Sequence, residues 1–299
     1  MTGDVFDVIA LTAGAVTDRL LITERRGVQV WRVTAAGSDA VSVGQRLAVK
    51  VVVPCPGYPS AGQLPAREYA VMNALREHFG GGWKPAWAGI AATGPFTVAP
   101  WYDGPSTWDL WQPVRDGTYH DAERRAAVRA AVELCETVAA LHEAGWVHGD
   151  LQAAHCIHTG NGPRLIDLCN AHGPGLPDDD RREGAALIHL EAPELARALV
   201  QGRAVPVTTA ASDVYAIAGS LWACASGEWP LAYDAHGLDE DEATTWQLRA
   251  AIGSGRVPLR LYPRLWPDLR GVLVAALAAD PDRRPSADRL GRQLACLTG

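Results

Sequence analysis

The stretch HGDLQAAHCIHTGNGPRLID, residues 148–167, lies in a part of the chain with a mainly helical pattern. Before it, residues 126–142 are rich in Ala, Val and Leu at helical spacing, which predicts a long helix. After it, residues 214–227 and 269–277 predict two more buried helices. We therefore expect the chain from about Ala122 onward to be mainly helical.

The part upstream of this region has the pattern of strands. β-Branched and aromatic runs separated by Gly, Ser and Asp are typical of an antiparallel sheet. These runs are residues 20–23, 28–34 and 47–53, and residues 92–101 predict a further strand.

Between these strands, a Pro- and Gly-rich loop is expected over residues 54–65, followed by a helix over residues 66–78. Tyr69, Met72 and Leu75 recur at i, i+3 and i+6, which suits one apolar face of that helix.

Strands followed by helices predict the α+β class rather than a parallel α/β sheet. The change of pattern falls near residues 103–105, so we expect two domains, residues 1–102 and 103–299. No internal repeat or low-complexity segment is visible.

The composition excludes several classes of protein. The chain has 299 residues, of which 48% are hydrophobic and 20% charged, so a disordered or collagen-like chain does not fit. The net charge of -7 argues against a nucleic-acid partner, because phosphate contacts need clustered cations. The 6 cysteines lack C-x-x-C spacing, which disfavours a zinc site or a disulfide framework.

The sequence also gives no reason to expect a membrane protein. Asp4 and Asp7 stand where a signal peptide would be basic. The longest uncharged apolar stretch, residues 214–227, is shorter than the roughly 20 residues that a membrane span needs. We expect a soluble, cytoplasmic protein with no membrane partner.

A series of short motifs follows in an order that chance rarely produces. In chain order the series is Leu47-Ala48-Val49-Lys50, Glu68, His148-Gly149-Asp150, His155, Ile166-Asp167-Leu168-Cys169, Ala192-Pro193-Glu194, Ser212-Asp213-Val214-Tyr215 and Asp280-Pro281-Asp282-Arg283-Arg284-Pro285-Ser286. From about Leu20 to Leu297 the chain resembles the protein-kinase superfamily, and in particular the eukaryotic-like Ser/Thr kinases of bacteria.

The resemblance implies a bilobal kinase-like fold. Residues 1–102 would form a small nucleotide-binding lobe of antiparallel strands plus one helix, and residues 103–299 a larger, mainly helical catalytic lobe. By the same resemblance, Lys50 holds the α and β phosphates of ATP and Glu68 pairs with Lys50. The alternatives are an ordinary surface lysine and a solvated helix residue. The scarcity of lysine favours the phosphate-binding role of Lys50 over that of a surface lysine. Lys50 and Lys84 are the two lysines of the chain, and Lys84 has no assigned role.

Two aspartates carry the chemistry that the resemblance implies. Asp150 would accept the proton of the attacking hydroxyl, and Asp167 would bind Mg²⁺ that bridges the phosphates. Either residue could instead cap a turn. His148 is expected to be a packed structural histidine.

The resemblance also implies three structural residues in the second domain. Glu194 and Arg284 would form a buried ion pair, and Asp213 would anchor the loop that carries Asp150. They support the fold and not turnover.

The chain departs from the kinase pattern at the phosphate loop. Thr23, Arg25 and Val28 occupy the positions of the three usual glycines, with Gly27 one residue away. Backbone amides can still reach phosphate there, but side chains crowd the approach that glycine leaves open.

A second group of departures surrounds Asp150. His155 replaces the asparagine that binds a second Mg²⁺, and imidazole suits softer metals than Mg²⁺. His155 could leave a one-metal site, accept Mn²⁺, contact phosphate directly, or be a buried histidine without a ligand role. Gln152 and Ala153 replace the usual Lys and Pro, which removes a phosphate-contacting cation.

Further departures concern regulation. Cys169 replaces a hinge glycine and is most simply a small packed residue. Gly149 stands where regulated kinases carry an arginine that pairs with a phosphorylated residue. Residues 167–194 contain no Ser, Thr or Tyr, so phosphorylation of that segment is not expected to activate the protein.

Tryptophans gather near the domain boundary. Trp101 and Tyr102 are candidates to flank an adenine, whereas packing is the default for tryptophans, including Trp108 and Trp111.

The leading hypothesis is an ATP-dependent Ser/Thr kinase that acts on a protein or peptide with Mg²⁺ or Mn²⁺. The substrate could be a ribosomal precursor peptide, as for the kinase domains of lanthipeptide synthetases. A pseudokinase that binds nucleotide or a partner, and a small-molecule phosphotransferase, are the alternatives. The oligomeric state stays open.

Overall fold

The computed structural model describes residues 4–53, 55, 62–80, 87–176, 187–202, 206–261 and 265–298. Most of the predicted loop over residues 54–65, together with Lys84 and the charged run at residues 178–182, lies outside the described residues. The chain divides into two compact units, Met1–Tyr102 with Gly175–Pro177 and Asp103–Pro174 with Asp178–Gly299. Each unit is described by itself.

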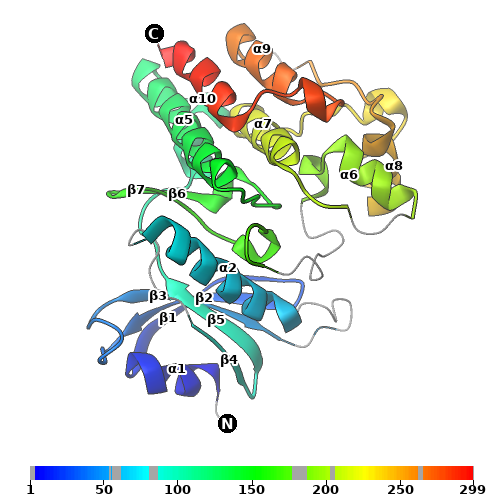
Figure 1. Ribbon diagram of the computed structural model, residues 1–299. Coiled ribbons are helices and arrows are strands. Elements are labelled where there is room, and N and C mark those ends of the chain that lie inside the picture. Colours follow the sequence, from blue (N-terminus) through cyan, green and yellow to red (C-terminus); the bar gives the residue numbers. More distant parts are fainter. Residues whose placement is uncertain are drawn as a thin grey trace. The chain divides into compact units, whose positions relative to one another are not determined.

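The first unit is built on an antiparallel sheet with strand order β1-β2-β3-β5-β4 (Figure 1). The strands are β1 (Val16–Arg25), β2 (Val28–Ala35), β3 (Arg46–Val52), β4 (Trp87–Ala91) and β5 (Gly94–Pro100). The predicted small antiparallel sheet is confirmed, and β4 is a strand that the sequence did not reveal.

Two helices cover this sheet, α1 (Val5–Ala13) and α2 (Leu64–Phe79), and they lie on opposite sides of it (Figure 1). Leu47, Val49 and Val51 of β3 are buried in one cluster with the apolar side chains of α1. Because side chains alternate along a strand, Lys50 projects from the other face.

The helix predicted over residues 66–78 is confirmed as α2, but one residue of its expected apolar face is misplaced. Val71, Met72 and Leu75 are buried, whereas Tyr69 is 36% exposed. An α-helix has 3.6 residues per turn, so its buried stripe follows positions i, i+3, i+4 and i+7. In α2 this stripe begins at Glu68, one position before Tyr69.

The second unit is mainly helical, and the three predicted helices are confirmed as α5, α7 and α9. Its helices are α3 (Thr107–Leu110), α4 (Gln112–Arg115), α5 (Asp121–Glu143), α6 (Pro193–Val200), α7 (Ala210–Ser226), α8 (Thr245–Ser254), α9 (Pro267–Ala276) and α10 (Ala287–Ala295), with short 3₁₀ turns between them and the hairpin of β6 (Cys156–Thr159) and β7 (Gly162–Leu165).

Helix α7 is the centre of this unit. Its residues from Ser212 to Ser226 are all buried, and the helix runs from a Thr209 cap to Gly227 in the left-handed region. Helices α5 and α10 pack along each other (Figure 1). Within the described residues the protein is therefore α+β, and no helix there combines the length and hydropathy needed to cross a bilayer.

Candidate functional site

Lys50 and Glu68 form an ion pair inside the first unit. The Lys50 Nζ atom lies 3.0 Å from Oε1 and 2.9 Å from Oε2 of Glu68, so both carboxylate oxygens contact the amine. The Lys50 side chain is 15% exposed and the Glu68 side chain 9%. The pairing is therefore as predicted, and the alternatives of a surface lysine and a solvated glutamate are wrong.

The position of the glycine-rich loop is a tight hairpin turn. Arg25 pairs with Val28, so only Arg26 and Gly27 connect β1 to β2. Both have positive φ, 53° and 76°, which is typical of the two-residue type I′ turn. The contact of these backbone amides with a phosphate stays a prediction.

Gly27 is needed in this turn for a second reason. A Cβ atom there would lie 2.7 Å from Cβ of Cys55 and 2.9 Å from the carbonyl oxygen of Val53. The turn is thus packed against the chain that leaves β3.

Trp101 and Tyr102 close the first unit and are both partly buried. The Trp101 amide donates to the Arg46 carbonyl at 3.0 Å, and the Arg32 guanidinium lies over the Trp101 ring at 5.6 Å. Their contact with adenine stays a prediction. Trp111, in contrast, is fully buried, which confirms a packing role for that residue.

In the second unit, Asp213 holds the loop that leads to Asp150. Its carboxylate accepts hydrogen bonds from the backbone amides of His148 at 2.8 Å and Gly149 at 3.0 Å. Nε2 of His142 lies 3.0 Å from the same carboxylate. The predicted anchoring role of Asp213 is confirmed, and α7 provides the anchor because Asp213 lies in its first turn.

His148 is fully buried and its ring hydrogen bonds fix it as neutral. Nδ1 accepts from the Asp150 amide at 3.3 Å, and Nε2 donates to the Ile166 carbonyl at 3.1 Å. Burial lowers the pKa of His148 to about 4. The histidine therefore ties the Asp150 loop to the end of β7, which confirms its predicted packing role.

Gly149 has a backbone that explains its identity. Its φ is 78°, and a Cβ atom would lie 2.7 Å from the carbonyl oxygen of Asn170. An arginine at this position would be strained and would clash with the backbone.

Asp150 is 8% exposed and is oriented by a neighbour. The Gln152 side-chain amide donates to Oδ1 of Asp150 at 3.1 Å. Gln152 stands where kinases carry lysine, so the aspartate here receives an oriented hydrogen bond without a positive charge.

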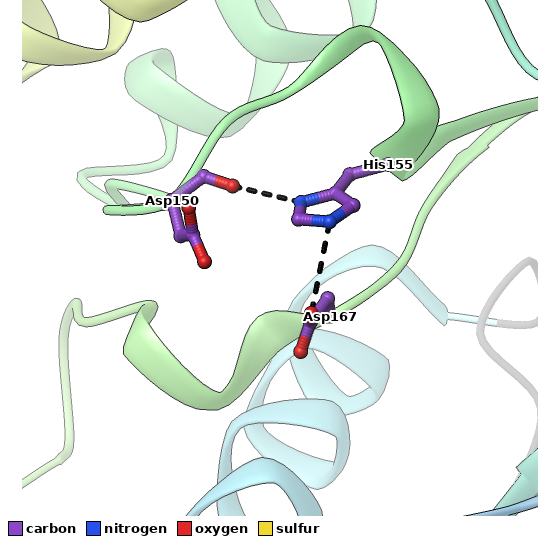
Figure 2. Close-up of side chains that lie close together, drawn as sticks. All are labelled: Asp150, His155 and Asp167. Atoms are coloured by element: carbon purple, nitrogen blue, oxygen red, sulfur yellow. Dashed lines mark hydrogen bonds and ion pairs between the residues drawn. The ribbon is translucent and has the colours of Figure 1, made fainter. Parts of the chain in front are cut away.

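His155 lies between the two aspartates (Figure 2). Its Nδ1 atom is 2.8 Å from the backbone carbonyl oxygen of Asp150, and its Nε2 atom is 3.7 Å from Oδ2 of Asp167. A carbonyl only accepts hydrogen bonds, so Nδ1 must carry a proton. Nε2 is the atom that faces the carboxylate.

Asp167 has a strained backbone that aims its side chain. Its φ of 60° and ψ of 54° lie in the left-handed region, which is rare for residues other than glycine. The Cys169 thiol donates to Oδ1 of Asp167 at 3.4 Å. Cys169 is buried, so the expectation of a small packed cysteine is confirmed, and its contact with the aspartate is additional.

Asp150, His155 and Asp167 together offer three ligand atoms that all lie within 4.8 Å of one another. Such a cluster can hold one divalent cation. The two carboxylates fit Mg²⁺, which prefers oxygen ligands, whereas the imidazole fits a softer ion better. Lys50 and Glu68 belong to the other unit.

Glu194 and Arg284 form the predicted ion pair. The Arg284 guanidinium donates to both Glu194 oxygens at 2.8 and 2.7 Å and to the Ala211 carbonyl at 3.0 Å. The arginine side chain has no exposed surface, and the glutamate is 23% exposed. The pair fastens α6 to the segment before α10.

Some contacts were not visible in the sequence. Nε2 of His158 lies 2.8 Å from the Thr107 hydroxyl and Nδ1 lies 2.7 Å from Glu133. These are the residue types of a nucleophilic triad, but Thr107 is fully buried, so substrate cannot reach the hydroxyl. The array instead fastens α3 to β6 and α5. A polar residue facing inward on β6 is the only sequence signal for it.

Comparisons with known proteins add no family assignment. No protein-family model matches the chain, and no curated protein matches its sequence significantly.

Proposed function

We propose that the protein is an ATP-dependent phosphotransferase of the protein-kinase type. In this proposal the two units form a bilobal kinase-like fold. The reaction uses the Lys50–Glu68 pair of the first unit together with Asp150 and Asp167 of the second. The observation that carries the proposal is the agreement between motif order and local geometry. Lys50 pairs with Glu68, and Asp150 and Asp167 converge on one point, as kinase chemistry requires.

The proposed reaction moves one phosphoryl group to a Ser or Thr hydroxyl. The hydroxyl oxygen attacks the γ-phosphorus, the bond from that phosphorus to the bridging oxygen of ADP breaks, and the hydroxyl proton passes to Asp150. Gln152 orients Asp150 for this step. Lys50 neutralises the α and β phosphates, and a metal ion held by Asp167, Mg²⁺ or Mn²⁺, would neutralise the remaining charge.

The proposed acceptor is a protein or peptide. Support comes from the Glu194–Arg284 pair and the Asp213 anchor, which belong to the motif series of protein kinases and disfavour a small-molecule phosphotransferase. The segment from Asp167 to Glu194 has no hydroxyl residue to phosphorylate. An enzyme without that switch suits a constitutive task, and we propose a ribosomal precursor peptide as the substrate.

A nucleotide- or partner-binding pseudokinase is the second candidate. One observation favours it, namely that Thr23, Arg25 and Val28 occupy the glycine positions of the phosphate loop. Such a protein would bind nucleotide without turnover.

The test is transfer of phosphate to peptides. The full chain is incubated with ATP, with Mg²⁺ or Mn²⁺, and with candidate precursor peptides, and mass spectrometry detects phosphate. We expect Asp150→Asn to lower the rate by about 100-fold or more, because a positioned base contributes at least that much. Asp116→Asn, an exposed aspartate of the same unit, is the matched control. Tight ATP binding with no phosphate on any peptide would support the pseudokinase instead.

A further inference from the structure

We propose that β1 of the first unit pairs with β1 of a second copy of this chain. The two strands run antiparallel about a two-fold axis, so the two sheets join into one. The inference concerns a surface of the first unit, and it does not rest on the proposed phosphotransferase activity.

The first argument is the position of β1 in the sheet. It is the end strand of the order β1-β2-β3-β5-β4, so within the described residues β2 is its single neighbour. A strand at the edge of a sheet presents a row of backbone N–H and C=O groups to any strand that aligns with it. β1 therefore has the hydrogen-bonding edge that pairing with a further strand requires.

The second argument is that neither face of β1 is covered. Every residue of the strand after Val16 is exposed, whereas β2 has no exposed residue. Leu20, Leu21 and Ile22 are 47%, 40% and 44% exposed. Because successive side chains of a strand point to opposite faces, this run leaves apolar surface on both faces. A strand alongside β1 would remove part of that surface from water.

The third argument is the charge pattern, which makes β1 complementary to itself. The dipeptide Asp18-Arg19 precedes the apolar run, and the dipeptide Glu24-Arg25 follows it. Two copies can align antiparallel with Asp18 of one opposite Arg25 of the other. In this register Arg19 lies opposite Glu24, and the two-fold axis repeats both pairs. Opposite charges that face each other across two strands stabilise their pairing.

The same charges select this register over its neighbours. A shift of one residue in one direction would place Asp18 opposite Glu24. A shift of one residue in the other direction would place Arg19 opposite Arg25. Like charges directly opposite each other are destabilising, so one register is favoured and both adjacent registers are opposed.

The fourth argument is that the paired charges lie on the same face of the sheet. The Arg19 guanidinium lies 4.2 Å from the ring centroid of Phe6, which belongs to α1. Glu24 is opposite Gln29 of β2, and Gln29 accepts a hydrogen bond from Trp31, whose ring also contacts Phe6. Arg19 and Glu24 therefore both lie on the face that α1 covers. A two-fold axis perpendicular to the sheet keeps this face common to both copies.

The irregular register of β1 bears on which strand can pair with it. Its pairing with β2 shifts between Thr17 and Leu20 and again between Leu21 and Thr23. Such bulges increase the twist of an edge strand and disfavour pairing with strands that lack it. A second copy has the same twist. A single pair of strands is a small interface, and small interfaces belong to transient complexes, so we expect the dimer to dissociate on dilution.

The experiment is analytical ultracentrifugation of the full chain over a range of concentrations. We expect a species of twice the chain mass to form as concentration rises, and nothing larger, because a two-fold interface is closed. Arg19→Glu and Glu24→Arg each place like charges opposite each other twice, and each should raise the Kd by about 10-fold. Arg76→Glu, at an exposed arginine of α2, is the matched control and should leave the Kd unchanged.

A mixture of the two variants tests the pairing itself. One variant has acidic groups at both positions and the other has basic groups at both, so opposite charges face each other again when one copy of each associates. We expect the equimolar mixture to dimerise about as well as the unmodified protein. The double variant, Arg19→Glu with Glu24→Arg, should also recover. A variant that had only lost its fold would not be rescued by its partner.

Four results would overturn the inference. They are an unmodified protein that stays monomeric at every concentration, a species larger than the dimer, an unchanged Kd in Glu24→Arg, and a mixture that associates no better than its separate components. If Arg19→Glu does not fold because its contact with Phe6 is lost, Glu24→Arg alone still decides the matter. Phosphate transfer enters none of these measurements, so the dimer and the proposed activity succeed or fail separately.

Discussion

Lys50 is the residue on which the proposed chemistry depends most. On the proposed function, we expect Lys50→Met to lower phosphate transfer by about 100-fold or more, because it would remove the cation that neutralises the α and β phosphates. The fold should persist with reduced stability, because Glu68, whose side chain is 9% exposed, loses its cation. Phosphate transfer and the circular dichroism spectrum measure the two effects.

The matched control for this change is Lys84→Met, which removes the other lysine of the chain. It should leave turnover unchanged. Full activity in Lys50→Met would show that Lys50 does not hold the phosphates of ATP.

A substitution at Gly149 tests whether the loop that leads to Asp150 needs a residue without a Cβ atom at this position. We expect Gly149→Ala to destabilise the protein by about 1–3 kcal/mol, because a residue with a Cβ is strained at φ 78° and would clash with the Asn170 carbonyl. Gly202→Ala has the same strain, with φ 64°, but nothing within 4 Å of the new atom. Chemical denaturation of both variants separates the clash from the strain. Equal losses would mean that the clash is relieved.

Individual residues differ in how far the sequence could reveal them. The ion pair of Lys50 with Glu68 was predictable because the motifs that contain these residues have characteristic spacing and flanking residues. The contact of His142 with Asp213 was not, because it joins residues that lie 71 positions apart and depends on how α5 packs against α7. The tight turn at Arg26 and Gly27 was also missed, because strand register is a tertiary property.

At the scale of elements, the Glu194–Arg284 pair fastens α6 within its unit. We expect Arg284→Met to destabilise the protein by about 3–5 kcal/mol, because it leaves Glu194 without its cation and the Ala211 carbonyl without its donor. Arg292→Met breaks an exposed pair with Asp288 on α10 and should cost less than about 1 kcal/mol. Urea denaturation gives both values. A loss at Arg284 as small as that at Arg292 would contradict the prediction.

Some elements could be predicted and others could not, for physical reasons. Strands β2 and β3 and helices α5 and α7 have long runs of matching pattern, so local sequence decides them. Helix α1 was missed because its sequence, VFDVIALTA, contains β-branched residues that disfavour a helix. Its Asp4 cap and its packing against β3 overcome that preference.

At the scale of the whole molecule, stability should fall in acid, and His189 contributes to this. The ring stacks on Trp229 with centroids 4.9 Å apart, and its Nδ1 atom lies 3.3 Å from the Tyr233 hydroxyl. Burial lowers the pKa of His189 below its ordinary value of 6.5, the nearby Arg260 also lowers it, and Glu240 opposes the shift.

The sign follows from the lowered pKa. As pH falls through the ordinary value, the unfolded chain takes up a proton at this histidine before the folded chain does, so the free energy of unfolding decreases. Unfolding midpoints at about pH 7.5 and about pH 5.5 measure the loss. His189→Asn should show a smaller loss than the unmodified protein, and His236→Asn should not. Identical losses in all three proteins would contradict the prediction.

The fold class could be predicted for the whole chain because strand patterns and helix patterns occupy separate stretches. The strand order and register could not, since they depend on contacts between distant residues. Of the candidate site, the sequence predicted the identity of Asp150, His155 and Asp167, and the structure added the direction in which His155 faces.

The two-residue turn at Arg26 and Gly27 bears on how the first unit folds. Strands β1 and β2 are neighbours in the chain, so their pairing closes a short loop at a small cost in conformational entropy. Strand β3 pairs with β5 across all the residues between them, so that pairing closes a much longer loop. We therefore expect the β1–β2 hairpin to form before the rest of the sheet.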